Sequence, residues 1–258
     1  MRGAGVFITL EGPEGSGKSS QGRWLVRRLR RAGHQVTFLR DPGSTALGRA
    51  LRRVLLHTTA PLSPLAEALL FIGGRVQLVE EKIVPALTRG HVVICDRFHD
   101  STVVYQGDAG GIDVPWLDRL GRAAIRGVMP SLTVVLDLPT ANGFARLRRA
   151  PDRMERKAQR FHRRVRAGYR RLARQEPRRV VVIDASQSPD AVRQRIDTII
   201  RQRLTARHSS PDTRFRRRAP AMAGGPVGRA WPTRRGRDVA PRGTGSFRCR
   251  ATARGAPQ

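Results

Sequence analysis

Residues 12–19 read Gly12-Pro13-Glu14-Gly15-Ser16-Gly17-Lys18-Ser19 and match every position of the pattern G-x-x-x-x-G-K-[ST]. The apolar run Val6–Leu10 directly precedes this loop, and a helical pattern follows it. The glycines let backbone N–H groups point inward at phosphate oxygens, and the dipole of a helix that begins near Lys18 favours the same anions. We therefore predict a phosphate-binding loop in which Lys18 reaches the β and γ phosphates of a nucleotide and Ser19 ligates Mg²⁺.

The lysine of this loop is unusual in a chain whose cations are nearly all arginine. Lys18, Lys82 and Lys157 are its three lysines. A compact ammonium on a flexible stem fits between phosphates where a planar guanidinium would not. The position of Lys18 therefore favours a phosphate site over the alternative, a glycine turn that merely joins a strand to a helix.

Outward from the loop, residues 1–204 alternate nearly continuous apolar runs with helical patterns. The runs are Val6–Leu10, Val36–Leu39, Val92–Asp96, Leu132–Leu138 and Val180–Asp184. Such runs are typical of strands that are covered on both faces of a parallel sheet. The longest helical pattern is an apolar stripe of Leu65, Leu69, Ile72, Val76, Val79 and Ile83. Strands joined by helical crossovers predict a doubly wound α/β domain with a five-stranded parallel sheet covered by helices.

Charge is distributed unevenly along the 258 residues, which carry 50 Lys and Arg against 20 Asp and Glu. Residues 205–258 contain 13 Arg, no Lys and two acids, and they show no helical or alternating apolar pattern. This Arg/Pro/Gly-rich composition cannot bury enough apolar surface to offset the entropy of ordering, so we predict a disordered tail after a domain of residues 1–204. The net charge of +30 suggests polyanion binding. Because the charge is distributed unevenly, the total alone does not indicate the function of the domain.

Some classes are disfavoured by features that the sequence lacks. No apolar run approaches the ~20 residues that cross a bilayer, and Val6–Leu10 is too short for the apolar core of a signal peptide. We therefore expect a cytoplasmic protein with no membrane partner. Cys95 and Cys249 lie far apart and form no C-x-x-C, which argues against a disulfide framework and a zinc site.

Further motifs narrow the class of phosphate-loop protein. The base-reading N-K-x-D of GTPases and the L-S-G-G-Q of ABC-type ATPases are absent. A strand that ends in Asp96-Arg97 and a cluster of arginines near residue 150 instead point to a small kinase. Because Asp96 ends the third predicted strand, it should lie beside the loop at the carboxyl edge of the sheet, where an acid can hold Mg²⁺ through water. A helix N-cap is the alternative role for Asp96.

The remaining motifs occur in an order that resembles the thymidylate kinase family over residues 5–204. They are Arg40-Asp41-Pro42-Gly43-Ser44-Thr45, the helical segment 67–77, Asp96-Arg97-Phe98, the segment 101–107, Asp152-Arg153-Met154-Glu155, the segment 161–169 and Ile183-Asp184-Ala185. The resemblance implies the three-layer fold of P-loop nucleoside-monophosphate kinases and the reaction ATP + dTMP → ADP + dTDP. It also implies Mg²⁺ as cofactor and a homodimer. Because the phosphate loop carries Glu14 and no arginine, residues 146–153 are similar to the arginine-bearing lid of bacterial members.

The resemblance also implies roles for individual residues. The residues expected to bind ATP are Gly12, Pro13, Glu14, Gly15, Ser16, Gly17, Lys18, Ser19 and Ser20, and those expected to hold the metal are Ser19 and Asp96. The residues expected to bind dTMP are Glu14, Phe71, Arg75, Arg97, Thr102, Tyr105 and Gln106. Arg97 would contact the monophosphate, Arg75 and Phe71 the base, Glu14 the 3′-hydroxyl, and Tyr105 the 2′ position. The expected catalytic cations are Lys18 and Arg153, followed by Arg148 and Arg149.

Several alternatives stay open from the sequence. The chain could phosphorylate another (deoxy)nucleoside monophosphate, or it could be a nucleic-acid-binding protein that uses the basic tail on a kinase-like scaffold. Phe71 could be a core residue, Arg75 and Arg97 could form solvated ion pairs, and residues 146–153 could be a solvated basic loop. The composition of the tail also matches a GC-rich coding sequence read out of frame, and we expect the tail to be dispensable for catalysis.

Overall fold

The structure is a computed structural model and describes residues 5–208. Within these residues the five predicted strands are confirmed as one parallel sheet in the order β2-β3-β1-β4-β5. The strands are β1 (Val6–Glu11), β2 (Val36–Arg40), β3 (Val92–Asp96), β4 (Leu132–Asp137) and β5 (Val180–Asp184). Every residue of β1, β3 and β4 is buried, which explains why these stretches of sequence are almost continuously apolar.

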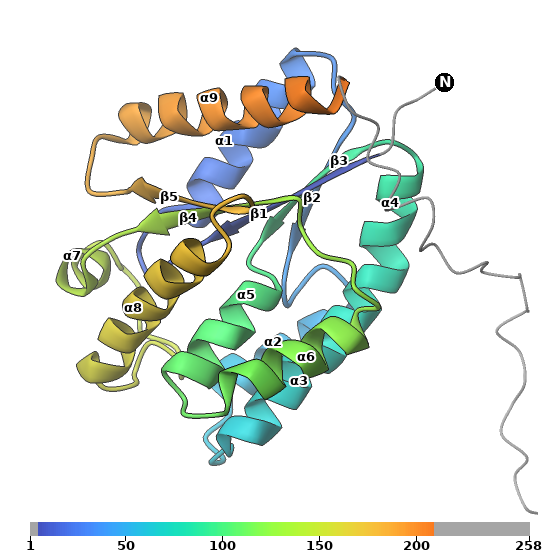
Figure 1. The fold of residues 1–258 in the computed structure, drawn as a ribbon. Helices are drawn as coiled ribbons and strands as arrows, with labels where there is room; N and C mark the ends of the chain where they lie inside the picture. The colour runs from blue at the N-terminus through green and yellow to red at the C-terminus, as the bar shows by residue number, and fades with distance from the viewer. Residues whose placement is uncertain (1–4, 209–258) are drawn as a thin grey trace, which may run out of the picture. The chain divides into compact units, whose positions relative to one another are not determined.

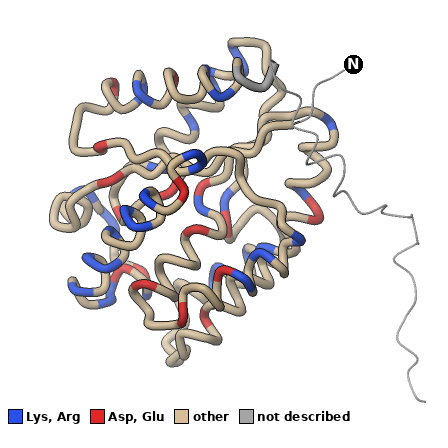
Figure 2. The backbone as a smooth tube through the Cα atoms, viewed as in Figure 1, with Lys and Arg blue, Asp and Glu red and all other residues tan. Residues whose placement is uncertain are grey.

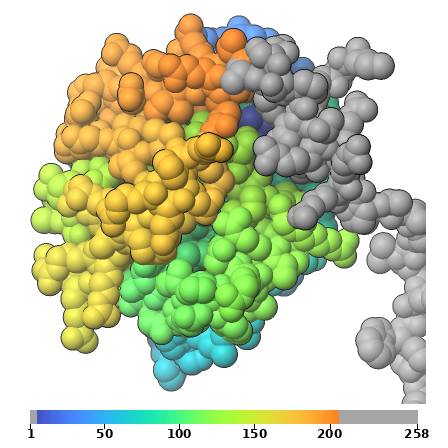
Figure 3. Space-filling view, viewed as in Figure 1, coloured from blue at the N-terminus to red at the C-terminus, as the bar shows by residue number. Residues whose placement is uncertain are grey.

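Helices cover both faces of the sheet, so the predicted three-layer α/β arrangement is confirmed (Figure 1). α1 (Lys18–Arg31) and α9 (Pro189–His208) lie on one face. The other helical segments are α2 (Ala46–His57), α3 (Pro64–Leu78), η1 (Val79–Ile83), α4 (Val84–Thr88), α5 (His99–Thr102), η2 (Val103–Asp108), α6 (Val114–Ala124), α7 (Thr140–Ala145) and α8 (Gln159–Gln175). Figure 3 shows α6, α8 and α9 adjoining on one side of the molecule, where their side chains hide most of the sheet.

Apolar clusters on both faces of the sheet stabilise this arrangement. Leu25 and Leu29 of α1 and Ile196 of α9 pack against one face of the sheet, at positions that their helical spacing predicts. Phe7 of β1 and Cys95 of β3 point to the opposite face, where they pack against η1 and α4. Alternate residues of each strand therefore serve different cores, as the pleat of a sheet requires.

The longest predicted stripe lies on one continuous helical run and is buried over only part of its length. The helical run continues from α3 through η1 and α4, and Ile72, Val79 and Ile83 are buried. Leu65 and Leu69 are instead 45% and 49% exposed. At this end α3 packs against α2, which covers the helix from another side. Two large apolar side chains on α3 therefore belong to the surface.

The strand order places a ligand crevice at the end of β1. β1 lies in the middle of the sheet, with β3 on one side and β4 on the other, so the connections that follow these strands diverge there. Leu10 of β1 lies level with Asp96 of β3 in the parallel register. Open α/β sheets bind ligands at the carboxyl ends of strands where the order reverses in this way. The phosphate loop that follows β1 is therefore in the expected place.

The last helix continues past the predicted end of the domain, because α9 ends at His208 rather than near Leu204. The rest of the predicted tail, residues 209–258, lies outside the described residues. No helix among residues 5–208 is long and apolar enough to cross a membrane.

Candidate active site

A cavity of about 480 Å³ opens at the carboxyl ends of β1, β2 and β3. Its walls come from the loop after β1, the turn after β2, α3, η2 and the connection between α7 and α8. That connection and α8 are strongly basic, since residues 146–175 contain 13 Lys or Arg and two acids, and Figure 2 shows these basic positions gathered there. A concave site with converging cations suits a ligand that carries several negative charges.

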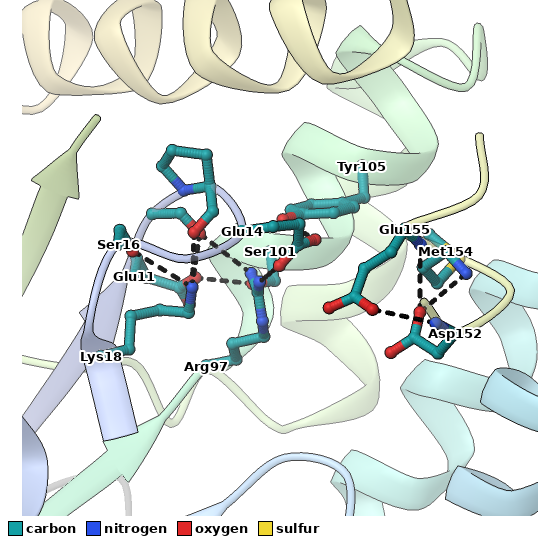
Figure 4. A network of polar contacts seen from close by, with 12 residues as sticks. Glu11, Glu14, Ser16, Lys18, Arg97, Ser101, Tyr105, Asp152, Met154 and Glu155 are labelled. Atoms are coloured by element: carbon teal, nitrogen blue, oxygen red, sulfur yellow. Dashed lines mark hydrogen bonds and ion pairs between the residues drawn. The ribbon is translucent and has the colours of Figure 1, made fainter. Parts of the chain in front are cut away.

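Lys18 is held inside the phosphate loop by its own backbone (Figure 4). Its ammonium donates to the carbonyl oxygens of Gly12 and Pro13 at 3.0 and 2.7 Å, and it lies 3.3 Å from the hydroxyl of Ser16. Burial lowers the pKa of Lys18 to about 8, and the nearby Arg97 acts in the same direction. The loop therefore holds the desolvated Lys18 ammonium in a position where phosphate oxygens of a ligand can replace these carbonyl groups as hydrogen-bond acceptors.

All nine residues predicted to bind ATP belong to this cradle. Gly12, Pro13 and Ser16 hold Lys18 as described, and the cavity is lined by Glu14, Gly15, Gly17, Lys18, Ser19 and Ser20. The loop glycines are required by close approach as well as by conformation. A Cβ on Gly15, whose φ is 68°, would lie 2.0 Å from the carbonyl oxygen of Gly143 in α7. The loop thus packs directly against the helix that leads into the basic connection.

Ser19 and Asp96, the two predicted metal ligands, are brought together. The Ser19 hydroxyl donates to the Asp96 carboxylate at 2.5 Å, and the Arg40 guanidinium lies 3.4 Å from the same oxygen. The N-cap of α5 is Phe98, and no side chain caps this helix, so Asp96 does not have the alternative role of an N-cap. Two hard oxygens at the cavity edge are donors of the kind that Mg²⁺ prefers.

Glu14 and Arg97 form the centre of the contact network between the loop and η2 (Figure 4). The Glu14 carboxylate accepts from the Arg97 guanidinium and from the Tyr105 hydroxyl, each at 2.7 Å. The guanidinium carbon also lies 4.9 Å from the centroid of the Tyr105 ring. Burial raises the pKa of Glu14, but Arg97, Lys18 and the Tyr105 hydrogen bond outweigh it, so the pKa lies below its usual value. Glu14 is therefore an ionised acceptor inside the site.

Glu11, the last residue of β1, is hydrogen-bonded to residues next to this network. No role was assigned to it from the sequence. Its carboxylate accepts from the Phe98 backbone N–H at 2.7 Å, the Ser101 hydroxyl at 2.6 Å and the Tyr169 hydroxyl at 2.8 Å. Arg97, directly before Phe98, has a φ of 69°, which is rare for a residue with a long side chain. Glu11 thus helps to hold the strained turn that aims Arg97 at the cavity.

Glu11→Gln is expected to change how stability depends on pH. Burial, followed by the charge of Asp100, raises the pKa of Glu11 to about 7. A carboxyl whose pKa is raised on folding contributes stability that is fully present below pH 4.5 and is lost as pH rises through 7. From pH 5 to pH 8 the wild type should therefore lose about 2.5 kcal/mol of unfolding free energy relative to the non-titrating variant.

Denaturant unfolding of both proteins at pH 5, 6, 7 and 8 measures this difference. The exposed Glu80 provides a control, because Glu80→Gln makes the same chemical change outside the core. Wild-type and Glu11→Gln curves that stay parallel across this pH range would contradict the expected titration.

The end of the cavity predicted to bind the base is built by α3, α5 and η2. Phe71, Thr102 and Gln106 line the cavity together with Tyr105. Arg75 lies behind them and is 2% exposed. Its guanidinium donates to Asp41 at 2.5 Å and to the Thr102 hydroxyl at 2.9 Å, and its Nη1 atom has no partner. Arg75 therefore keeps one unused donor and has an ion pair that is buried rather than solvated.

The connection from α7 to α8 presents Arg149 to the cavity. The Glu155 carboxylate holds the Arg149 guanidinium through two hydrogen bonds at 2.6 and 2.9 Å. Asp152 accepts from the backbone N–H groups of Met154 and Glu155, each at 3.0 Å, and this closes the turn (Figure 4). The acids of the D-R-x-E motif therefore shape a turn that positions an arginine. Arg148 is exposed and does not line the cavity.

Arg153 points away from the cavity toward α3. It donates to the backbone carbonyl of Leu55 at 2.7 Å and to the Glu67 carboxylate at 2.5 Å, and its side chain is 17% exposed. It is not among the residues that line the cavity. In this geometry Arg153 anchors the connection to α2 and α3, and its predicted catalytic role stays a prediction.

Sequence reasoning assigned no individual role to several other charged residues of the site. Among them are Arg40, Arg52, Arg146 and Glu155, all of which line the cavity. Arg40 and Glu155 stand inside motifs that the sequence displays, so their positions were available as signals. Arg52 lies on α2, and no local pattern distinguishes it from the many surface arginines.

The cavity has the phosphate loop at one end and the predicted base site at the other. Arg97 and Phe71 line the cavity beside the loop, and the basic connection between α7 and α8 also lines it. With the three-layer fold, this arrangement defines a P-loop kinase of nucleoside monophosphates. Residues 10–196 match the family model of thymidylate kinase, and the chain belongs to this family.

Individual relatives agree with this assignment. The chain is 48% identical over 199 residues to a thymidylate kinase of Synechococcus sp. (strain JA-2-3B'a(2-13)), an alignment that covers 77% of this chain and 96% of the relative. It is 46% identical over 201 residues to a thymidylate kinase of Deinococcus radiodurans, with 77% and 98% covered. A crystal structure of thymidylate kinase from Ehrlichia chaffeensis superposes with a TM-score of 0.63 at 32% identity, covering 76% of this chain and 99% of that one.

Proposed function

We propose that this chain transfers the γ-phosphoryl group of ATP directly to dTMP, forming ADP and dTDP. The observation that carries the proposal is that Lys18 and Arg97 donate hydrogen bonds to the same carbonyl oxygen. Lys18 Nζ and Arg97 Nη1 lie 3.0 and 3.2 Å from the carbonyl oxygen of Gly12. In this family's arrangement Lys18 serves the phosphates of the donor and Arg97 the monophosphate of the acceptor. The two cations thus converge where a transferring group would lie, as in-line transfer requires.

Positioning and charge neutralisation supply most of the catalysis in such a transfer. Phosphate oxygens of ATP would replace the loop carbonyl groups as acceptors for Lys18. The phosphate loop lacks an arginine, so the cation that balances the developing charge must come from elsewhere. We assign this role to Arg149, because it lines the cavity and Arg153 and Arg148 do not.

The acceptor nucleotide would lie between η2 and α3. Glu14 would accept from the sugar 3′-hydroxyl, because an ionised carboxylate is repelled by phosphates and attracted by a hydroxyl donor. The Tyr105 ring, fixed by its hydrogen bond to Glu14, would restrict space at the 2′ position. Phe71 would stack on the base, with Gln106 and Thr102 at the base edge and Arg75 behind them.

A substrate panel tests this function. The purified chain is assayed for ADP release with ATP and dTMP, dUMP, dCMP or dAMP as the acceptor. The highest kcat/KM is expected with dTMP. A preference for another monophosphate would favour the second candidate function, a related nucleotide kinase, and no turnover with any of them would contradict the kinase assignment.

We also propose Mg²⁺ as the cofactor, held by Ser19 directly and by Asp96 through water. The donor set fits this ion, because Mg²⁺ is usually bound by one or two protein oxygens together with substrate phosphates. When bound, the ion neutralises charge on the β and γ phosphates. Ser19 and Asp96 would hold the ion, and the hydrogen bond between them keeps both side chains at the same edge of the cavity.

Asp96→Asn is expected to raise the free Mg²⁺ concentration needed for half-maximal rate by about tenfold or more, since loss of a supporting carboxylate weakens metal sites to this extent. Initial rates at fixed ATP over a Mg²⁺ titration measure the shift. The exposed Asp190 provides the matched control, because Asp190→Asn removes a carboxylate that does not line the cavity. An unchanged Mg²⁺ requirement in Asp96→Asn would contradict the assignment.

We further propose a homodimer that uses α2 and α3. Four large apolar side chains on these adjoining helices are exposed: Leu47 at 43%, Val54 at 44%, Leu65 at 45% and Leu69 at 49%. Apolar side chains gathered on neighbouring helices are typical of an interaction surface, and a homodimer interface is the most apolar kind. This face also accounts for the exposed end of the α3 stripe.

Leu69→Glu is expected to convert the dimer to a monomer, because a charge buried at an apolar interface without a partner costs several kcal/mol. Sedimentation velocity at micromolar concentration measures the change. Val182 is also exposed and apolar but lies on β5, so Val182→Glu is the matched control and should remain dimeric. A wild type that sediments as a monomer would contradict the proposal.

Two further proposals rest on the sequence. A cytoplasmic location follows from the two nucleotide substrates. Nonspecific binding of polyanions by residues 205–258 follows from their 13 arginines, and filter binding to single-stranded DNA at low and high salt would measure it.

A further inference from the structure

One buried carboxylate joins the base end of the cavity to the basic connection between α7 and α8. Glu67 lies on α3, and its side chain is 2% exposed. It accepts from Gln106 Nε2 at 2.7 Å, from Arg153 Nη2 at 2.5 Å and from Lys157 Nζ at 3.1 Å. These three donors come from η2 and from the connection, which lie far from Glu67 in the sequence. The contacts therefore tie three separate segments to a single side chain.

The chemistry of Glu67 fixes the orientation of Gln106. Burial raises the pKa of Glu67, but Lys157, Gln106 and Arg153 outweigh it, so the pKa lies below its ordinary value and the group is ionised at neutral pH. An ionised carboxylate accepts hydrogen bonds and cannot donate. The amide of Gln106 must therefore turn its NH₂ group toward Glu67. Gln106 lines the cavity, and its carbonyl oxygen, which is not the atom that contacts Glu67, remains as a hydrogen-bond acceptor.

We propose that Glu67 is a positioning residue that sets the direction of the Gln106 amide, so that the base end of the cavity offers a hydrogen-bond acceptor to the pyrimidine. This inference rests on the proposed function. Thymine carries an N–H at position 3, which a carbonyl oxygen can accept. Cytosine carries a lone pair there, which a carbonyl oxygen repels. Glu67 thus contributes to the choice of base without touching it.

The two cations that contact Glu67 help to keep it ionised and therefore support the same role. Arg153 and Lys157 neutralise the buried carboxylate, which would otherwise be costly to keep ionised. Glu67 also lies one helical turn before Phe71 on α3, and residues four apart share a helix face. The side chain that anchors the connection is therefore next to both predicted base contacts, Phe71 and Gln106.

Glu67→Gln tests the proposal through base selectivity. A glutamine at this position can donate as well as accept, so the amide of Gln106 is free to turn its NH₂ group toward the base. The ratio of kcat/KM for dTMP to that for dCMP is expected to fall by about tenfold or more. The same substitution in a Gln106→Leu background should produce no further change in the ratio, because the amide through which it acts is absent.

The exposed Glu80 provides the matched control, since it contacts only the exposed Arg126 at 3.7 Å and Glu80→Gln should leave the ratio unchanged. Equal losses with dTMP and dCMP in Glu67→Gln would overturn the proposal and indicate a merely structural role. A wild type that does not phosphorylate dTMP would instead contradict the proposed function.

A second measurement applies if Glu67→Gln does not fold. Side-chain amide exchange in the ¹⁵N-labelled wild type reports the Gln106 NH₂ group directly. Its protons are expected to exchange at least tenfold more slowly than those of the exposed Gln194, because they are held by a buried carboxylate. Equal exchange rates for the two amides would overturn the proposal.

Discussion

Lys18→Met is expected to lower kcat by about a thousandfold, because removing one preorganised charge from the transferring group costs this much in comparable sites. The ammonium lies within hydrogen-bond distance of Gly12 and Pro13, at the oxygen that Arg97 also contacts. Methionine keeps the aliphatic stem of the side chain and removes only the charge. Single-turnover formation of dTDP measures the chemical step separately from product release.

The same variant should remain folded. Burial lowers the pKa of Lys18 to about 8, so the folded chain bears a cost to keep this ammonium inside the loop. Removing it should leave the melting temperature unchanged or raise it, as expected when a site sacrifices stability for function. Lys82 is exposed on η1, and Lys82→Met is the matched control for both activity and stability. A kcat for Lys18→Met within about threefold of wild type would contradict the assigned role.

Arg149→Met is expected to lower kcat by about a hundredfold to a thousandfold with little effect on stability, because a transition-state arginine contributes at least this much in phosphoryl transfer. Arg149 lines the cavity, and Glu155 holds its guanidinium at 2.6 Å. Its side chain is 57% exposed, so its removal disturbs little packing. Steady-state kcat and the melting temperature, measured on the same preparation, separate the two effects.

Arg153→Met should lower stability more than it lowers kcat. This residue anchors the connection through Glu67 and the Leu55 carbonyl, and its loss should cost about 2 kcal/mol of unfolding free energy. The loss of kcat should be at least tenfold smaller than in Arg149→Met. The exposed Arg156 lies on the same connection, and Arg156→Met should change neither quantity. A larger kcat loss in Arg153→Met than in Arg149→Met would reverse the assignment and favour the order that the sequence alone suggests.

The fold was predictable because its signals are local. Strands buried on both faces need continuous apolar runs, and the phosphate loop needs glycines at fixed positions, so both can be seen in short stretches of sequence. The proximity of Ser19 and Asp96 also followed from a general rule, since the carboxyl ends of neighbouring parallel strands meet at one edge. Their separation of 2.5 Å agrees with that rule.

The parts that sequence reasoning missed depend on partners far along the chain. Glu11 looks like the end of a strand until the hydroxyl groups of Ser101 and Tyr169 are seen to reach it. Arg153 stands in a motif with nearby arginines, and no spacing reveals that its partner is Glu67 on α3. The exposure of Leu69 is likewise invisible, because helical spacing identifies an apolar face but does not say what covers it.

The most direct test of the account follows the phosphoryl group itself. The purified chain is incubated with Mg²⁺, dTMP and ATP labelled at the γ-phosphate, and the nucleotides are separated. With wild type we expect the label to appear in the β-phosphate of dTDP, and with Lys18→Met we expect it to appear at least a hundredfold more slowly. Release of the label as inorganic phosphate without labelled dTDP, or equal rates for the two proteins, would contradict this expectation.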